Sequence, residues 1–279
     1  MSGILYLVAT PIGNLEDMTF RAVRILKEAD LIAAEDTRTS APLLSHYEIK
    51  TPMTSYHEFN KLEKGETLID KLKEGQNIAI ITDAGTPGIS DPGEELVARC
   101  YEEGIEIFAV PGAVAAITAV TTSGQHCRRF AFEAFLPKQK KDRKRILDEL
   151  KEETRTIIIY EAPHHLLDTL KEIKGTLGDE REITLCRELT KKFEEKLKMT
   201  LLEAVSYYEE NEPRGEYVLC IAGKSRQQVE EETKAKWEDI SLEEHLQNYV
   251  NQGMDKKEAM KAVAKDRGIS KRDVYNALL

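Results

Sequence analysis

The fold is decided by a short apolar run that ends in a loop rich in glycine and proline, Ile80-Ile81-Thr82-Asp83-Ala84-Gly85-Thr86-Pro87-Gly88-Ile89-Ser90-Asp91-Pro92-Gly93. The apolar run at residues 78–81 predicts a buried strand, and the pattern of residues 94–100 predicts a helix after the loop. A plain crossover needs only about 2–6 residues and no such density of glycine and proline. Glycine lets a backbone approach a ligand closely, and proline holds a loop in one shape. Because open α/β sheets bind ligands in loops at the carboxyl ends of their strands, we interpret this loop as a ligand site.

The first half of the chain alternates strand and helix on both sides of this loop. Apolar runs predict strands at residues 4–9, 31–34, 78–81 and 105–110, with helical patterns between them. A short helix is expected around residues 43–47. Strands that alternate with helices of this length indicate βαβ units and a largely parallel sheet.

The second half has a different pattern, in which a hairpin accompanies the crossovers. Strands are expected at residues 130–135, 156–160, 183–189, 193–199 and 217–222. A hairpin pairs its strands antiparallel, whereas crossovers pair them parallel, so this sheet is expected to be mixed. We therefore predict an α/β fold with two α/β domains, residues 1–122 and 123–225, followed by a linker and a small helical tail at 226–279.

The tail has the outline of a helix-turn-helix. From about residue 226 the composition shifts to Gln, Glu and Lys, which is typical of a linker. Further on, Gly268 is placed to stop one helix and Ser270 to cap the next. A helical hairpin that caps the domain or a dimer fits the same pattern, so both interpretations stay open.

Composition and charge exclude several classes of protein. Of 279 residues, 41% are hydrophobic and 32% are charged, which suits a soluble globular protein that buries a real core. No apolar run approaches the ~20 residues of a membrane span, and no basic leader precedes the first apolar run, so we expect a cytoplasmic protein. The four scattered cysteines predict reduced thiols and no zinc site. The net charge of −10 argues against wholesale coating of nucleic acid, but a local basic patch can still contact RNA.

Polar or glycine-rich clusters follow seven of the apolar runs. They are residues 10–14, 35–38, 55–58, 83–91, 111–115, 161–165 and 187–190. A single acid after a strand is usually a helix cap, but seven clusters at corresponding strand ends indicate a shared cleft. The cleft carries neither a Gly-x-Gly-x-x-Gly fingerprint nor a Walker loop. His164 and His165 are adjacent in sequence, so no metal pair is expected.

A basic run stands out against the acidic chain. It carries six cations within eight positions: Lys138, Lys140, Lys141, Arg143, Lys144 and Arg145. A charge run is usually a solvated face, but this one follows an aromatic strand and is suited to contact phosphates. Lys191 and Lys192 could extend such a patch.

Seven segments together resemble the tetrapyrrole methylase superfamily, and within it the enzymes that methylate ribosomal RNA. The segments are residues 8–15, 35–38, 83–93, 110–112, 135–138, 160–164 and 187–191. Each segment alone has little specificity, whereas their combination and order are specific. The resemblance runs from about residue 3 to residue 223 and continues weakly through the tail.

The resemblance implies a homodimer of two α/β domains with S-adenosylmethionine in the cleft between them. It implies transfer of a methyl group to the ribose 2′-hydroxyl of a cytidine in the decoding region of 16S rRNA. The assembled small ribosomal subunit is the expected partner, and naked rRNA stays open as the substrate. By position, the cofactor-binding residues would be Pro11, Asp83, Ala84, Gly85, Thr86, Ile89, Val114, Ala115, Tyr160, Glu161, Cys186, Arg187, Glu216 and Tyr217. Thr82-Asp83-Ala84 replaces the Gly-Asp-Pro of porphyrin-methylating relatives, which weakens a porphyrin assignment.

This chemistry needs a group that accepts the proton of a ribose hydroxyl, and it needs no metal. The candidates are His57, Glu58, Asp36, Glu161 and Glu188, of which we favour Glu58 or Glu161. Arg38 and Arg187 could hold phosphate or a neighbouring acid, and Arg38 joins the predicted RNA-binding residues. Two alternatives remain open, a porphyrinoid methylase of the same superfamily and a non-catalytic protein that binds RNA through its tail. Cofactor binding separates the last alternative from the other two.

Overall fold

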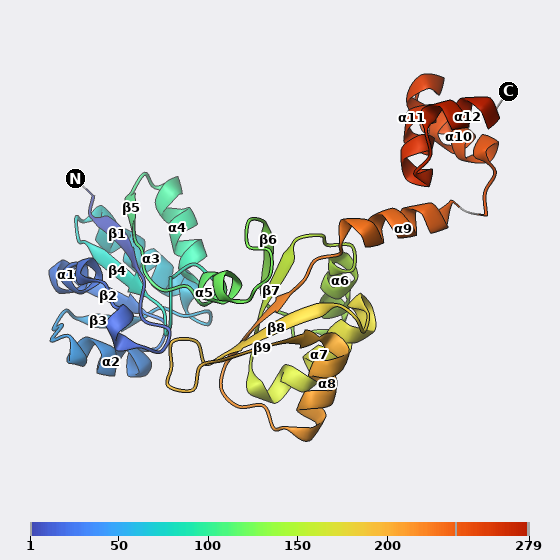
Figure 1. The fold of residues 1–279 in the computed structure, drawn as a ribbon. Coiled ribbons are helices and arrows are strands. Elements are labelled where there is room, and N and C mark those ends of the chain that lie inside the picture. The colour runs from blue at the N-terminus through green and yellow to red at the C-terminus, as the bar shows by residue number, and fades with distance from the viewer. Residues whose placement is uncertain (1, 238, 278–279) are drawn as a thin grey trace. The chain divides into compact units, whose positions relative to one another are not determined.

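A computed structural model describes residues 2–237 and 239–277 (Figure 1). The strands are β1 (Ile4–Val8), β2 (Leu31–Ala34), β3 (Met53–Ser55), β4 (Ile78–Ile81), β5 (Glu106–Val110), β6 (Phe130–Phe135), β7 (Thr156–Glu161), β8 (Glu182–Arg187), β9 (Glu195–Thr200) and β10 (Tyr217–Ile221). The α-helices are α1 (Phe20–Glu28), α2 (Thr37–His46), α3 (Lys61–Lys73), α4 (Gly93–Glu102), α5 (Ala115–Thr122), α6 (Lys140–Leu150), α7 (Leu166–Leu177), α8 (Leu201–Glu210), α9 (Arg226–Lys236), α10 (Leu242–Asn251), α11 (Lys256–Arg267) and α12 (Lys271–Ala277). Two 3-10 helices, η1 (Leu15–Asp17) and η2 (Pro163–His165), complete the described elements.

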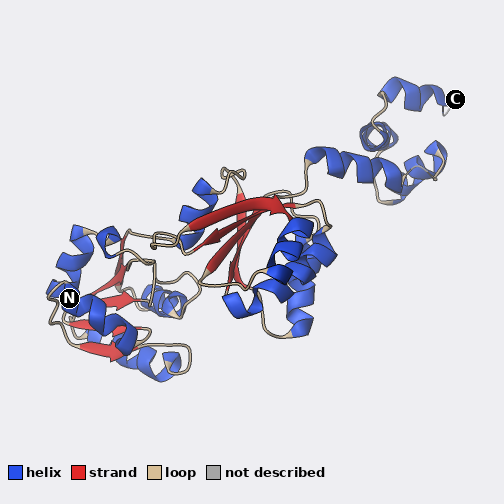
Figure 2. Cartoon of the chain, turned by 60° about the horizontal axis from the view of Figure 1, so that its bottom comes forward, coloured by secondary structure: helices blue, strands red, loops and turns tan. Residues whose placement is uncertain are grey.

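The first sheet is entirely parallel, in the order β3-β2-β4-β1-β5. Its central strand β4 is apolar and buried throughout, as expected for a strand covered on both faces. Helices α1 and α2 pack on one face, and α3 and α4 pack on the other (Figures 1 and 2). Because all five strands run the same way, their carboxyl ends lie along one edge. The predicted parallel sheet is confirmed.

The second sheet is mixed, in the order β6-β7-β10-β8-β9. Strand β10 runs antiparallel to both of its neighbours, β7 and β8, and the hairpin β8–β9 is antiparallel as predicted. Helices α6, α7 and α8 share one apolar core with this sheet. Helix α5 covers the other face, where Ala116, Ala119 and Val120 pack against residues of β7, β8 and β10 (Figure 1).

Two helices differ from the sequence expectations because their caps are strong. Helix α2 starts at Thr37, well before the expected residues 43–47, because the Asp36 carboxylate accepts the N–H of Arg38 at its N-terminus. The stretch interpreted as a linker from about residue 226 forms α9. The Ser225 hydroxyl accepts the N–H of Gln228, and the Gln228 side chain accepts the N–H of Ser225. This capping box satisfies two backbone donors, so a polar sequence still forms a helix.

The chain divides into two compact units, one of residues up to 150 together with 155–222, and one of residues 151–154 together with those from 223 onward. The first unit holds both sheets. Within the second unit, α10, α11 and α12 enclose a small apolar core. Gly268 ends α11 in the left-handed conformation, and the Ser270 hydroxyl accepts the N–H of Asp273 at the start of α12. The predicted stop and cap are confirmed, while the predicted division at residues 122 and 225 stays a prediction.

Candidate functional site

Strand ends from both sheets surround a cavity of about 410 Å³. The loops after β1, β4 and β5 line it from the first sheet, and the ends of β7 and β8 with the start of β10 line it from the second. This volume lies within the range of about 300–1,000 Å³ that is typical of small-ligand sites. We refer to it as the first cavity.

The loop after β4 is held in shape by hydrogen bonds to the end of β1 and within itself. Thr10 and Gly85 exchange two backbone hydrogen bonds of 2.9 and 3.1 Å. The Asp91 carboxylate accepts the N–H of Gly88 at 2.8 Å and that of Gly93 at 2.8 Å. Gly85 has a φ of +88°, a conformation that favours glycine. The loop is therefore preformed, with part of its backbone facing the cavity.

Three acidic residues meet where β2 and β4 end. The Glu35 carboxylate accepts the Thr82 hydroxyl and, at 3.4 Å, the N–H of Asp83. Asp83 Oδ1 accepts the N–H of Asp36 at 3.2 Å. Partial burial raises the pKa of Asp83, and the nearby Glu35 carboxylate raises it further. Hydrogen bonding from Arg38 instead lowers the pKa of Asp36 to about 2. The site thus presents concentrated negative charge, which suits a cationic group of a ligand.

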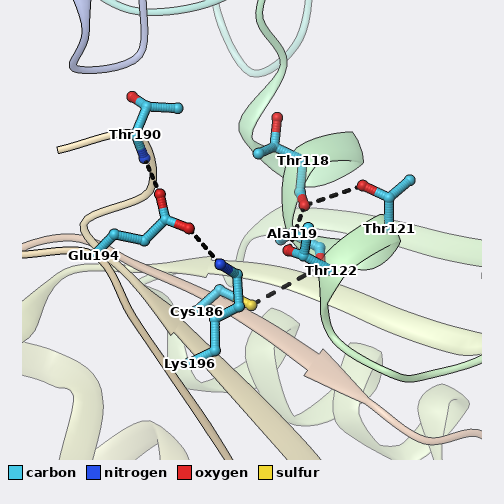
Figure 3. Close-up of polar contacts among 8 residues, drawn as sticks. All are labelled: Thr118, Ala119, Thr121, Thr122, Cys186, Thr190, Glu194 and Lys196. Carbon is cyan, nitrogen blue, oxygen red and sulfur yellow. Dashed lines mark hydrogen bonds and ion pairs between the residues drawn. The ribbon is translucent and has the colours of Figure 1, made fainter.

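The second sheet supplies the apolar wall and ties α5 to it. The Tyr160 hydroxyl oxygen accepts the N–H of Ala116 at 3.0 Å, so it satisfies one of the backbone donors at the start of α5. The Cys186 thiol donates to the Ala119 carbonyl at 3.9 Å, as Figure 3 shows. In the sheet register, Tyr217 lies beside both Glu161 and Arg187, which brings three predicted residues to one edge.

The loop between β8 and β9 places one lysine against both sheets. Lys191 Nζ lies 2.9 Å from Glu188 Oε1 and 2.8 Å from Glu216 Oε2. A Cβ added to Gly13 would fall 2.4 Å from Lys191 Cγ, so the lysine stem lies directly over the loop after β1. Figure 3 shows the Thr190 N–H donating to Glu194, 2.6 Å away, while Lys196 pairs with the same carboxylate. Burial raises the pKa of Glu188, but the hydrogen bonds from Lys191 and the Glu216 backbone outweigh it and lower that pKa overall.

Glu161 is held by a chain of contacts from behind the cavity. Its side chain accepts the N–H of Ala162 at 2.8 Å and the Thr169 hydroxyl at 2.5 Å. Arg143 in turn donates to the Thr169 hydroxyl at 2.6 Å and pairs with Glu172. Glu161 is 6% exposed, so its orientation is fixed where it lines the cavity.

A second cavity of about 460 Å³ adjoins the first. Its walls are the loop after β1 with Leu15, one face of α2, and the side of Lys191. The two cavities share a wall made of five residues, Ile12, Asp83, Ala84, Lys191 and Glu216.

The structure brings most of the predicted cofactor residues around the first cavity. They are Asp83, Ala84, Gly85, Thr86, Ile89, Val114, Ala115, Tyr160, Glu161, Cys186, Glu216 and Tyr217. Pro11 lines the second cavity, and Arg187 lines neither, since its guanidinium lies 3.3 Å from Glu195. Glu35 and Asp91 also line the first cavity, although the sequence motifs placed them only within the strand-end clusters 35–38 and 83–91 and not among the cofactor residues. The position of Glu35 directly after an apolar run was the signal that could have identified it.

The candidate general bases fall into two groups, those that line the first cavity and those that line neither cavity. Glu161 and Glu188 line the first cavity, whereas Asp36, His57 and Glu58 line neither cavity. The Glu58 carboxylate is 65% exposed and pairs with Lys61 at 2.8 Å. His57 follows β3, the edge strand farthest from β5, and its buried Nδ1 has no hydrogen-bond partner within the described part of the chain.

The predicted RNA-binding residues fall into two groups. Lys191 lines both cavities, with Lys192 next in sequence, whereas Arg38 lines neither cavity and its 90% exposed side chain pairs with Asp36. The basic run occupies the loop before α6 and the first turns of that helix. Lys138, Lys140, Lys141, Lys144 and Arg145 are exposed. Arg143 differs, because its guanidinium is 15% exposed and engaged by Glu172 and Thr169.

The comparisons with known proteins identify the family. The sequence profile of the family described as Tetrapyrrole (Corrin/Porphyrin) Methylases matches residues 4–205. The chain belongs to the tetrapyrrole methylase family. The Ribosomal RNA small subunit methyltransferase I of Halalkalibacterium halodurans is 52% identical to this family member over 98% of this chain and 94% of that protein. The protein of the same name from Bacillus subtilis is 49% identical over 99% of this chain and 94% of that protein. The resemblance inferred from the sequence motifs is confirmed.

Solved structures of other tetrapyrrole methylases share the fold. The native uroporphyrin III C-methyl transferase from Thermus thermophilus has a TM-score of 0.58 at 20% identity and covers 79% of this chain and 97% of that chain. The same enzyme complexed with S-adenyl homocysteine gives the same values. At this identity the likeness shows the fold, with its two α/β domains.

The described residues hold neither a cluster of metal ligands nor a helix that could span a membrane. Between residues 2 and 237 and between 239 and 277, no three or more His, Cys, Asp or Glu side chains gather as metal ligands. Over the same part of the chain, no helix combines the length and apolar character required to span a bilayer.

Proposed function

We propose that this tetrapyrrole methylase transfers the methyl group of S-adenosylmethionine to the ribose 2′-oxygen of a cytidine in the decoding region of 16S rRNA. The observation that carries the proposal is the first cavity, whose walls join the acidic strand ends of one sheet to the apolar face of the other. Relatives that are 52% and 49% identical over nearly the whole chain are named as ribosomal RNA methyltransferases, which supports this substrate class.

The residues of the first cavity fit S-adenosylmethionine chemically. The Asp83 carboxylate suits the ammonium of its methionine part, and the loop after β4 offers backbone groups to its carboxylate. Val114, Ala115 and Tyr160 suit the apolar faces of its adenine. The cofactor supplies an electrophilic methyl group on a sulfonium centre. The protein has to hold the acceptor oxygen in line with that group and exclude competing water.

The proton of the ribose hydroxyl needs an acceptor within hydrogen-bond reach. Of the favoured candidates, Glu161 lines the first cavity and Glu58 does not, so we propose Glu161. Its two hydrogen bonds hold the carboxylate in one orientation, and its oxygens retain lone pairs for a further donor. Glu58 and His57 follow β3 and line neither cavity, which leaves them less suited to this role.

The basic run, the exposed Lys192 and the partly exposed Lys191 are proposed to contact RNA phosphates. Lys138, Lys140, Lys141 and Lys144 carry exposed positive charge on an otherwise acidic protein. Such contacts orient the RNA without reading its sequence. Recognition of an assembled small ribosomal subunit fits a protein that contacts shape and backbone.

We also propose that the chain acts as a homodimer in the cytoplasm. Phe20 is 98% exposed and Phe108, on the edge strand β5, is 50% exposed. The Arg21 side chain donates to the Ala109 carbonyl on the same edge at 3.1 Å. Exposed apolar side chains beside a sheet edge are typical of an interface.

Methyl transfer from labelled S-adenosylmethionine tests the proposed function. The acceptors are small ribosomal subunits that lack the modification, naked 16S rRNA and a porphyrin precursor, assayed in parallel. We expect label on the subunit, recovered as 2′-O-methylcytidine after nuclease digestion. Label on the porphyrin precursor alone would make the chain a porphyrinoid methylase, and no cofactor binding at all would leave a non-catalytic RNA-binding protein.

A further inference from the structure

We propose that the second cavity receives the ribonucleoside that is methylated, turned out of its RNA strand, with the ribose at the wall shared with the first cavity. This inference rests on the proposed function and adds a binding site to it. Enzymes that do chemistry on a base extrude it into a pocket, where it stacks on aromatic or apolar side chains, and we infer the same placement for a nucleotide that is modified at its ribose.

The shared wall is the first observation behind this assignment. Asp83, Ala84 and Lys191 border both cavities. In-line transfer leaves no room for a side chain between the reacting atoms, so a methyl donor in one cavity and an acceptor in the other would meet where the two cavities adjoin, beside these residues. A volume of about 460 Å³ is within the range of small-ligand sites, so the second cavity accommodates one nucleoside rather than a folded RNA element.

Other residues of the second cavity suit a base. Pro42, Leu43 and His46 of α2 line it together with Leu15 of η1. Together they present two aliphatic side chains, a proline ring and an imidazole, the kinds of surface on which a nucleobase stacks. Thr39 and Ser40 add hydroxyl groups that can donate to or accept from the edge of a base.

The cavity is preformed, because hydrogen bonds fix both ends of α2. At its N-terminus, the N–H of Asp36 donates to Asp83, which belongs to the shared wall. At its C-terminus, the Tyr47 hydroxyl donates to the Leu15 carbonyl, and the His46 ring packs edge-on against Tyr47 with centroids 4.8 Å apart. A preformed pocket loses less conformational entropy when its ligand binds.

Two cations at or near the second cavity could contact the phosphates of an RNA strand. Lys191 borders the cavity, and Arg38, whose side chain is 90% exposed, precedes the α2 residues that line it. Lys191 is paired with Glu188 and Glu216, and Arg38 with Asp36, so each would exchange a carboxylate for a phosphate that flanks the extruded nucleoside.

The test places a bulky side chain in the second cavity, at a position that does not line the first cavity. Thr39 is exposed on the face of α2 that lines the second cavity, so Thr39→Trp should occupy the nucleoside site without disturbing the core. Ser45→Trp, exposed on the same helix and absent from both cavity walls, is the matched control. We expect Thr39→Trp to lower kcat/KM for small ribosomal subunits at least about tenfold, as loss of one stacked base does. Its Kd for S-adenosylmethionine should stay within about twofold of the unsubstituted chain. Unchanged kcat/KM in Thr39→Trp, or an equal loss in Ser45→Trp, would overturn the inference.

A second readout does not depend on catalysis. The full chain carries the photo-reactive amino acid p-benzoylphenylalanine at position 39, or at position 45 as the control, and is irradiated with small ribosomal subunits. We expect position 39 to cross-link to the nucleotide that the unsubstituted chain methylates, and position 45 to give no such cross-link. Methylation without this cross-link would overturn the nucleoside site and leave the proposed function intact. A cross-link to one rRNA nucleotide without methylation would keep the nucleoside site and remove the proposed function.

Discussion

Replacing Asp83 with asparagine is expected to weaken binding of S-adenosylmethionine about tenfold. Asp83 supplies the carboxylate proposed to face the ammonium of the cofactor. Hydrogen bonds to charged groups contribute about 1.5–3 kcal/mol, and Asp83 is exposed in the open cavity, so the lower end of that range applies. About 1.4 kcal/mol corresponds to a factor of ten in Kd.

The same substitution should leave the fold intact. An asparagine side-chain oxygen can still accept the N–H of Asp36, as Asp83 does at 3.2 Å. Loss of one negative charge beside Glu35 and Asp36 removes a repulsion, so stability should be unchanged or slightly higher. Thermal unfolding of Asp83→Asn checks this point. The matched control is Asp70→Asn, because Asp70 is exposed on α3, a helix that packs on the same sheet.

Titration calorimetry across pH gives the decisive comparison. In the unsubstituted chain, affinity should fall as the pH drops through the pKa of Asp83, because protonation removes the negative charge. Partial burial and Glu35 raise that pKa, so the loss begins at a higher pH than for an ordinary aspartate. Asp83→Asn should lack this loss. A Kd within about twofold of the unsubstituted chain at neutral pH would refute the assignment of the loop after β4.

Three further predictions test other parts of the account. Tyr160→Phe should lower the free energy of unfolding by on the order of 1 kcal/mol in denaturant, because the N–H of Ala116 loses its acceptor. The control Tyr101→Phe, at a position that is 76% exposed, should leave the free energy of unfolding unchanged. Lys138, Lys140, Lys141 and Lys144 should be replaced together with glutamine. The slope of log affinity for RNA against log salt concentration should then fall in magnitude by about four. An unaltered slope would show that the basic run is only a solvated face. His245 is fully buried against Trp237 at 3.6 Å, and burial followed by Arg267 lowers its pKa, with Asp266 opposing. The stability that this histidine contributes is therefore full above its unfolded pKa of about 6.5 and is lost as the pH falls below that value. The fluorescence of the single tryptophan should report this unfolding. A stability of the helical tail that does not change with pH would contradict the prediction.

The sequence was sufficient to predict the architecture, because the signals for it are local. Apolar runs followed by polar loops predicted the parallel sheet, and the carboxyl-end rule predicted where the cleft would lie. The glycine and proline density of residues 82–93 marked the loop that now lines the first cavity. These features depend on neighbouring residues, so they can be read without knowing how the chain folds back on itself.

The site required tertiary information where distant segments meet. The second cavity combines α2 with Lys191, which follows it by roughly 150 positions, and no local pattern predicts that juxtaposition. His57 and Glu58 looked equivalent to the other strand-end clusters, but β3 is an edge strand and its loop lies outside both cavities. Arg143 looked like one more cation of the basic run, yet it supports Thr169 and thereby Glu161.

A crystal structure of the chain with S-adenosylhomocysteine and an RNA fragment that contains the target cytidine tests the central claim most directly. We predict the cofactor product in the first cavity, the cytidine in the second, and the ribose 2′-oxygen facing the sulfur where the two cavities adjoin beside Asp83 and Lys191. A cofactor product bound elsewhere, or an acceptor ribose that approaches from a side other than the second cavity, would contradict it.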